Sequence, residues 1–315
     1  MSVSPSGINR DYSVEWSLSG SAFTNGHVAI KSSDKDSCIV KMGNVKGYGD
    51  LKVIATVTTD KGINIVSSKD VLVGTTLTVN IVSNQGTDAT IAEVKTEVKF
   101  GSTTLQVAGG TTVNIPVGES ISVTYPKVDG YTQPSVYTYT STTSAATASA
   151  TYSTTIVSVT MSDNQTSLND ISGVKATVKY DSVSTQVATG GTVKVPTGKS
   201  VTVTWGAVSG YSTPATNTFT ATGTSMQFEG VYKTAVLTLT VKTNQSSHTD
   251  VTSKSVTVKG TTVNTTLKSG GSVKVPFGEE VTLTAPAVNG YATPVAVKYT
   301  AADASKAVTM TYNTT

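Results

Sequence analysis

The stretch "GGSVKVPFGEEVTLTAPAVNGYATP", residues 270–294, has two earlier relatives in the same chain. "GGTVKVPTGKSVTVTWGAVSGYSTP" fills positions 190–214, and "GTTVNIPVGESISVTYPKVDGYTQP" fills positions 110–134, so successive copies begin at 110, 190 and 270 with one constant offset, a period of 80. This period exceeds that of the short solenoid repeats, which need neighbours to complete a core, and it suits a self-sufficient domain. The sequence therefore predicts a series of homologous modules.

Recurring residues outside and inside this stretch hold the three copies in one register. An Asn-Gln pair lies near the start of each copy, a Pro-x-Gly step and a Gly-Tyr step follow, and a tyrosine lies near its end. These markers are Asn84-Gln85, Asn164-Gln165 and Asn244-Gln245, then Pro116, Pro196 and Pro276, then Gly118, Gly198 and Gly278, then Gly130-Tyr131, Gly210-Tyr211 and Gly290-Tyr291, and finally Tyr152, Tyr232 and Tyr312.

Apolar residues alternate with polar ones inside each copy, as at Leu237, Leu239 and Val241. Such alternation is typical of antiparallel strands with one face in the core and one in water. In the third copy it predicts strands at 236–242, 255–259, 262–268, 272–276, 280–284, 295–300 and 306–312. No segment shows helical periodicity with caps. Short strands separated by Gly, Pro and Asn turns predict a two-sheet sandwich.

The recurring Gly and Pro residues are interpreted as features of the fold. The Gly pair before "TVKVP" supplies a positive φ in a turn, and Pro196 belongs at a strand end or an edge. Gly198 is expected to make a hairpin to the next strand, and Tyr211 to cover the end of the core. The equivalent positions Glu119, Lys199 and Glu279 change sign between copies, which argues against a charge-dependent site, and nothing titratable recurs with the motif.

Residues 1–74 follow a different pattern. "YSVEWSLSG" places Tyr12, Val14, Trp16 and Leu18 on one face, and "DLKVIATV" does the same for Leu51, Val53, Ala55 and Val57. A last strand is expected in "NIVSSKDVLV". A Trp strand, a strand with Cys38 and then Gly-x-x-x-Val-x-Ala-x-Val from Gly49 resemble the bacterial immunoglobulin-like domains of the Big-2 type. Little sequence precedes Tyr12, where such domains have one or two further strands.

The repeats resemble PEGA-type modules in their Val-Pro-x-Gly and Gly-Tyr-x-x-Pro steps, at 195–198 and 210–214 in the second copy. The predicted fold is all-β, a tandem array of antiparallel Ig-like sandwiches. Its domains are a divergent one at 1–74 and three repeats at 75–154, 155–234 and 235–315.

Composition limits the function. The net charge is +3 with scattered lysines, which gives no support for nucleic-acid binding. The single cysteine, Cys38, excludes an intramolecular disulfide and is expected in the core. No window approaches the roughly 18 apolar residues of a membrane span. No secretory leader is seen before Tyr12, and no anchoring signal at the carboxyl end.

No catalytic, cofactor-binding or metal-binding residue is predicted, and the binding residues are left unknown. His27 and His248 are far apart in sequence and, with one cysteine, make no metal cluster. Asp170 and Asp250 align with Thr90, which weakens a calcium loop built on them. No phosphate loop, nucleophile elbow or zinc-protease motif occurs. The protein is predicted not to be an enzyme.

The sequence gives little support to two further kinds of site. Lys–Asn isopeptide cross-links, as in some Ig-like pilus domains, need a buried acid beside both partners, and no candidate triplet recurs at the period of the copies. A carbohydrate-binding platform needs an exposed aromatic ring, but Trp205 has Tyr125 and Ala285 at its equivalents.

The expected role is structural display. The chain resembles Ig-like virion proteins of tailed phages that infect gut Bacteroidetes, which are head decorations, head fibres or tail appendages. The resemblance implies a virion protein assembled in the host cytoplasm. The alternatives are a cell-surface adhesin or pilus-type stalk, and an array of carbohydrate-binding modules. Expected partners are other virion proteins or sister chains through residues 1–74, and a host-surface glycan or protein bound weakly by many copies.

Overall fold

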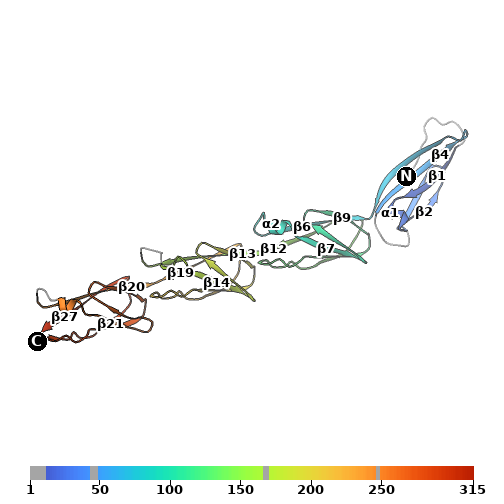
Figure 1. Ribbon diagram of the computed structural model, residues 1–315. Coiled ribbons are helices and arrows are strands. Elements are labelled where there is room, and N and C mark those ends of the chain that lie inside the picture. Colours follow the sequence, from blue (N-terminus) through green and yellow to red (C-terminus); the bar gives the residue numbers. More distant parts are fainter. Residues whose placement is uncertain (1–11, 43–48, 166–169, 246–248) are drawn as a thin grey trace. The chain divides into compact units, whose positions relative to one another are not determined.

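The computed structural model describes residues 12–42, 49–165, 170–245 and 249–315 (Figure 1). By its internal contacts the chain divides into two compact units, Met1–Ser153 and Thr154–Thr315. The elements of the described residues are strands and three helices of four residues each. The predicted all-β fold is confirmed.

The first part of unit one is a small sandwich of a three-stranded sheet, in the order β1-β4-β5, and a two-stranded sheet, β2-β3. Its core contains the predicted inward residues of β1 and β4 except Tyr12, which is half-buried and whose hydroxyl donates to Asp36. Cys38 is 4% exposed. Its elements are β1 (Tyr12–Ser19), α1 (Ser21–Thr24), β2 (Val28–Ser33), β3 (Cys38–Met42), β4 (Gly49–Thr59) and β5 (Asn64–Val73).

The first repeat completes unit one. A three-stranded sheet in the order β12-β6-β9 faces a four-stranded sheet in the order β11-β10-β7-β8. The elements are β6 (Thr75–Ser83), α2 (Ala89–Ala92), β7 (Lys95–Phe100), β8 (Thr103–Ala108), β9 (Thr112–Ile115), β10 (Ser120–Thr124), β11 (Tyr137–Thr140) and β12 (Ala146–Tyr152).

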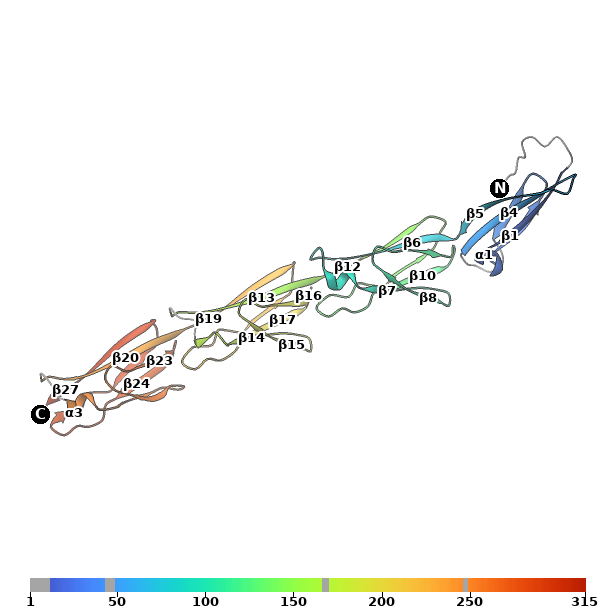
Figure 2. The ribbon, with the colours of Figure 1, turned by 45° about the horizontal axis from the view of Figure 1, so that its top comes forward.

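Unit two contains the second and third repeats, whose strands follow the same order (Figure 2). The second repeat has β13 (Thr154–Asp163), β14 (Lys175–Tyr180), β15 (Val183–Ala188), β16 (Thr192–Pro196), β17 (Ser200–Trp205), β18 (Asn217–Thr220) and β19 (Ser225–Tyr232). The third has β20 (Thr234–Thr243), α3 (Thr249–Thr252), β21 (Val256–Lys259), β22 (Asn264–Leu267), β23 (Ser272–Pro276), β24 (Glu280–Thr284), β25 (Tyr291–Ala292), β26 (Val297–Thr300) and β27 (Ser305–Thr314).

The seven strands predicted for the third copy are all present, and each begins and ends within two residues of its expected bounds. The short strand β25 was not predicted. Buried apolar residues of the described chain form four clusters, spanning 16–73, 77–152, 157–232 and 235–312. The four-domain division with its boundaries stays a prediction.

The Pro-x-Gly step does not make the expected hairpin. Gly198 has a positive φ of 92° and does lie in a turn. However, β16 and β17, which it joins, belong to different sheets, so the chain crosses from one layer to the other at this point. Alternation along each strand could not show this, because it identifies the inward face and not the neighbouring strand. Pro196 does end an edge strand, as expected.

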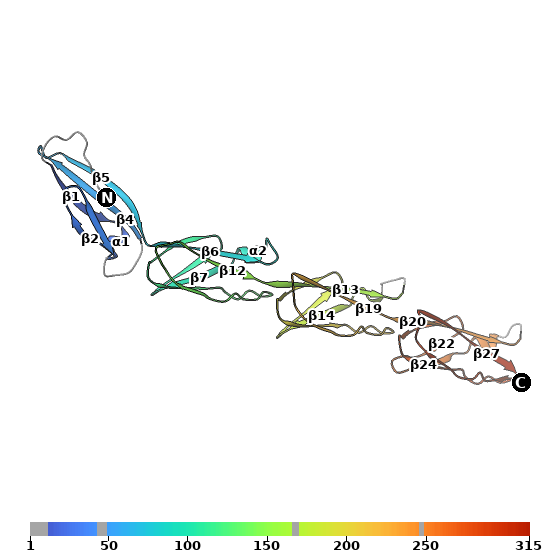
Figure 3. The same cartoon turned by 180° about the vertical axis from the view of Figure 1, so that it is seen from behind.

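A second difference from the sequence prediction is a parallel strand pair in each repeat. The first and last strands lie side by side and run in the same direction, as β13 and β19 do (Figure 3). Eight residue pairs join them, from Ile156–Ser225 to Asp163–Tyr232. The same pairing joins β6 to β12 and β20 to β27. Because the strands are parallel, each repeat is entered at one end of the sheet and left at the other.

The tyrosine that closes each copy is a buried structural residue. Tyr232 is fully buried, and its hydroxyl donates a hydrogen bond of 2.6 Å to the Gly206 carbonyl. Tyr152 and Tyr312 make the same bond, also 2.6 Å long, to Pro126 and Pro286. Burial raises the pKa of Tyr152 to about 12, with a smaller contribution from Tyr125. These bonds tie the last strand of one sheet to the loop that follows the central strand of the other.

Two neighbouring core positions hold side chains of different sizes in the three copies. Trp205 is 7% exposed, and a Cβ atom built on Gly230 would lie 2.5 Å from its ring. The equivalent positions hold Tyr125 with Ala150 in the first copy and Ala285 with Met310 in the third. A larger residue at one position thus accompanies a smaller one at the other.

We expect Gly230→Ala to destabilise the second repeat by about 1–3 kcal/mol, because the added methyl group overpacks the core against Trp205. Combining it with Trp205→Tyr restores the pair found in the first repeat, so the double variant should lose less stability than the sum of the single variants. Urea unfolding followed by circular dichroism measures each variant. Strictly additive losses would show that the two residues do not share one space.

Candidate functional site: the joint between the second and third repeats

A single residue, Lys233, links β19 to β20. Its carbonyl accepts a hydrogen bond of 2.9 Å from the Ser212 N–H in the second repeat and one of 3.3 Å from the Phe277 N–H in the third. Its ammonium group lies 5.7 Å from the centroid of the Phe277 ring, within cation–π range. The linker is therefore short and held by both repeats.

The Asn-Gln pair of the second repeat binds Thr234, the first residue of β20. The Asn164 amide donates to the Thr234 carbonyl over 2.8 Å and accepts from the Thr234 N–H over 2.9 Å. Gln165 donates to the carbonyls of Thr234 and Ala304, each at 3.2 Å. A side-chain amide offers both a donor and an acceptor. Asn164 therefore makes the two hydrogen bonds to the Thr234 backbone that a residue of a neighbouring strand would make.

Three side chains meet at a second point of the joint. Asp170 and Tyr211 belong to the second repeat, and Lys274 lies on β23 of the third. Lys274 forms an ion pair with Asp170, and its Nζ lies 2.9 Å from the Tyr211 hydroxyl. The Tyr211 hydroxyl donates to Asp170 Oδ2 over 2.9 Å, and the Lys274 ammonium lies 5.0 Å from the Tyr211 ring centroid. This Asp170–Tyr211–Lys274 cluster joins the two repeats through charge.

The backbone at Gly210 brings the two repeats into contact beside this cluster. Gly210 has a φ of 80°, and a Cβ atom built on it would lie 2.8 Å from Lys274 Cβ. Any larger residue would push β23 away. The glycine of the Gly-Tyr step thus serves both a turn and the close approach of the next repeat.

The charges of the cluster support one another. Hydrogen bonds from Lys274 and then Tyr211 hold the pKa of Asp170 below its ordinary value of 3.8. Burial lowers the pKa of Lys274, but hydrogen bonds with Asp170 and Tyr211 and their charge outweigh this, so the pKa is raised overall. Burial is the largest cause of the raised pKa of Tyr211. At neutral pH the cluster is an ion pair with a neutral phenol.

The sequence prediction that nothing titratable recurs with the Gly-Tyr step is wrong. Tyr211 donates to Asp170, while in the first repeat Tyr131 donates to Asp88. The spacing from Asp88 to Asp170 exceeds the period of the copies by two positions, so a comparison at that period aligns neither with the other. In the third repeat, burial and then the charge of Asp250 raise the pKa of Tyr291. The feature that the copies share is a carboxylate beside the tyrosine of the Gly-Tyr step. The sequence position of this carboxylate varies by two places.

The change of sign between positions 199 and 279 also has a local explanation. Lys199 forms an ion pair of 2.9 Å with Asp181 in the turn between β14 and β15. Glu279 accepts hydrogen bonds of 2.7 and 3.1 Å from the N–H groups of Thr262 and Val263 in the equivalent turn. Opposite charges therefore perform the same task of holding the neighbouring hairpin turn.

The remaining candidates contribute no site. His27 is half-buried, and His248 lies outside the described residues. Among the residues that the structure describes, no three His, Cys, Asp or Glu side chains are grouped so as to hold a metal ion. Tyr125 and Trp205 are 1% and 7% exposed, so neither ring is available as a sugar platform. No helix within the described ranges is long and apolar enough to cross a membrane.

No protein-family model matches the sequence, and no curated protein does. The Big-2, PEGA and phage resemblances therefore stay predictions. Among solved structures, the Bacillus anthracis TIE protein is 12% identical over 97% of this chain and 69% of its own, with a TM-score of 0.31.

Two pilins are also similar to this chain. Shaft pilin SpaA from Lactobacillus rhamnosus GG is 10% identical over 51% of this chain and 98% of its own, with a TM-score of 0.27. BcpA, the major pilin subunit of Bacillus cereus, is 12% identical over 76% of this chain and 99% of its own, with a TM-score of 0.23. At these identities and TM-scores the likeness carries no information on function.

We expect Lys274→Met to loosen the joint, because it removes the cation that Asp170 and Tyr211 share. Spin labels at Ser184→Cys and Thr266→Cys, on hairpins of the second and third repeats, would report the distance between the two repeats. The distance distribution should broaden in the variant.

The matched control is Lys298→Met, which removes an ion pair of 3.1 Å with Glu280 inside the third repeat and should leave the distribution narrow. Because the pKa of Asp170 is lowered, its contribution is present above about pH 3.8 and is lost as the pH falls through the lowered value. Acid should therefore broaden the distribution of the unaltered joint and not that of Lys274→Met. An unchanged distribution in Lys274→Met would show that the cluster does not hold the joint.

Proposed function

We propose that this protein is a non-enzymatic, load-bearing stalk segment of a cell-surface appendage of the adhesin or pilus type. The observation that supports this most is the parallel pairing of the first and last strands in every repeat. Tension applied to the two ends of a repeat pulls β13 and β19 along one another in opposite directions. The hydrogen bonds between them then share the load and must break together.

The joint supports the same proposal. A one-residue linker leaves little slack between the second and third repeats, and contacts from both repeats hold its carbonyl. Tension is therefore passed from β19 to β20 without first extending a flexible segment. Inter-domain linkers that permit free movement are longer and rich in Gly and Ser.

Pulling on the two ends of the chain should give three unfolding steps of equal length from the three repeats. Pulling the second repeat between Ser153→Cys and Thr197→Cys instead separates β13 from β16 at the end where Thr154 faces Pro196. That geometry breaks the hydrogen bonds one after another, so we expect a force several-fold lower. Single-molecule force spectroscopy in a Cys38→Ala background measures both. Equal forces in the two geometries would contradict a load-bearing role for the parallel pair.

A virion appendage is the second setting, and its support is the resemblance of the sequence to Ig-like phage proteins. A virion appendage, like a cell-surface stalk, would need rigid spacing and no catalysis. Docking through residues 1–74 and weak, many-copy contact of the repeats with a host glycan or protein are proposed for either setting.

Immunogold labelling with antibodies against the repeats separates the two settings. A stalk should be labelled on the surface of producing cells and remain with them after washing. Label confined to particles that sediment from a lysed culture would overturn the cell-surface proposal in favour of the virion.

A further inference from the structure

Strand β5 is an edge of the first sheet, whose order is β1-β4-β5. Among the described residues, no strand pairs with its second edge. It is ten residues long and contains no proline. Proteins usually protect such edges with proline, bulges or short length, because unpaired N–H and C=O groups are a template for another strand.

The apolar residues of β5 are exposed although those beside them are buried. Ile65 faces Val57 on β4, and Val71 faces Leu51. Val57 and Leu51 are 4% and 3% exposed, whereas Ile65 and Val71 are 50% and 41% exposed. The core of the sandwich therefore ends at β4, and the same apolar face continues uncovered onto β5.

We propose that β5 pairs antiparallel with β5 of a second copy of this chain. The two-fold axis would be perpendicular to the sheet, so the core-facing sides of both copies lie on one side of a six-stranded sheet. With the axis at Ser68, Ile65 faces Val71 of the second copy, and Ser67 faces Lys69 of the second copy. Each exposed apolar residue of this face then meets another one.

Two neighbouring registers also keep the core-facing sides of both copies on one side of the sheet, but they place less favourable side chains opposite each other. An axis at Lys69 would place two ammonium groups opposite each other, and like charges directly opposite are destabilising. An axis at Ser67 would place Ile65 opposite Lys69. On the core-facing side, the register centred on Ser68 pairs Ile65 with Val71 twice and places each Lys69 opposite Ser67, which is why a second copy fits this edge.

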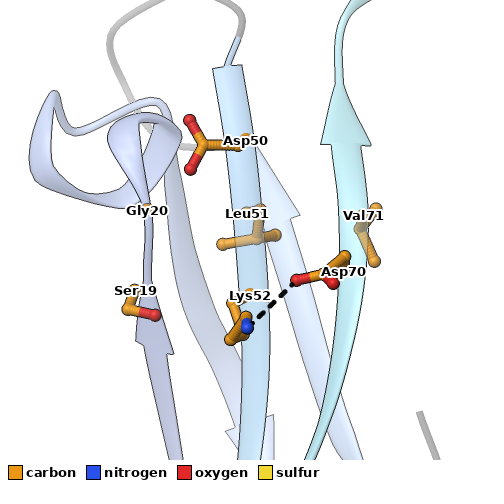
Figure 4. A pocket seen from close by; sticks show the side chains of 7 residues that line it. All are labelled: Ser19, Gly20, Asp50, Leu51, Lys52, Asp70 and Val71. Atoms are coloured by element: carbon orange, nitrogen blue, oxygen red, sulfur yellow. Dashed lines mark ion pairs between the residues drawn. The ribbon is translucent and has the colours of Figure 1, made fainter.

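The charge on the other face of β5 is already compensated. Lys52 on β4 forms an ion pair of 3.5 Å with Asp70 on β5, at the rim of a shallow hollow that Leu51 and Val71 also line (Figure 4). The Asp70 side chain stays 84% exposed, and in this register it lies opposite Val66 of the second copy. A second β5 can approach the free edge without meeting an uncompensated carboxylate.

Complementary charges test the pairing. The full-length variants I65E and V71K should each dimerise at least tenfold more weakly than the unaltered protein, measured by sedimentation equilibrium. Their equimolar mixture should recover dimers, because position 65 of one variant faces position 71 of the other, and the remaining Ile65–Val71 contact is intact. Both positions are exposed in the single chain, so circular dichroism should show both variants folded.

The register has its own test. Residue 68 faces itself across the axis, so Ser68→Cys should form a disulfide-linked dimer on mild oxidation, while Ser67→Cys, on the opposite face, should not. Cys38 is buried and leaves this readout clear. A monomer at all concentrations, open-ended oligomers, or equal cross-linking at positions 67 and 68 would overturn the proposal. It is independent of the stalk function, since the two pulling geometries are compared within the second repeat, which does not contain β5.

Discussion

In every repeat the backbone hydrogen bonds between the first and last strands join the two ends of that stretch of chain, and the parallel direction of these strands decides how the repeat can be used. An antiparallel pair would return the chain to the end where it entered. A parallel pair sends it out at the opposite end of the sheet, where the next first strand begins after one residue in unit two. Tandem connection and resistance to tension thus have one structural cause.

The joint between the second and third repeats extends this arrangement by polar contacts. Asn164 supplies a donor and an acceptor to the backbone of Thr234, and Thr234 is itself fully buried, with its hydroxyl 3.2 Å from the Val275 carbonyl. In the third repeat Asn244 likewise accepts from the Thr314 N–H, over 3.2 Å, but its amide donates to the Thr314 hydroxyl, over 3.4 Å. The asparagine therefore orients the chain just after the closing tyrosine. Lys274 adds a charged contact that only the neighbouring repeat can provide.

The three copies preserve spatial relations more strictly than individual residues. Trp205 with Gly230 fills a space that other copies divide between Tyr125 and Ala150 or between Ala285 and Met310. Lys199 and Glu279 hold equivalent turns with opposite charges. Close packing explains the first exchange, because interiors tolerate redistribution of volume better than its net gain or loss. The exchange of Lys199 for Glu279 is possible because a turn offers both carboxylates and N–H groups as partners.

The amino-acid sequence alone determined the period, the positions of the strands, their inward faces and the glycines with positive φ. Each of these depends on residues near one another in the chain, so alternation and turn chemistry are sufficient. The parallel strand pair, the crossing between sheets at Pro196–Gly198 and the carboxylate beside Tyr211 were decided by the tertiary structure. Alternation is the same whichever strand lies alongside, and a carboxylate can reach one tyrosine from two loop positions. The exposed apolar face of β5 likewise emerged only from packing, because its sequence is that of an ordinary strand.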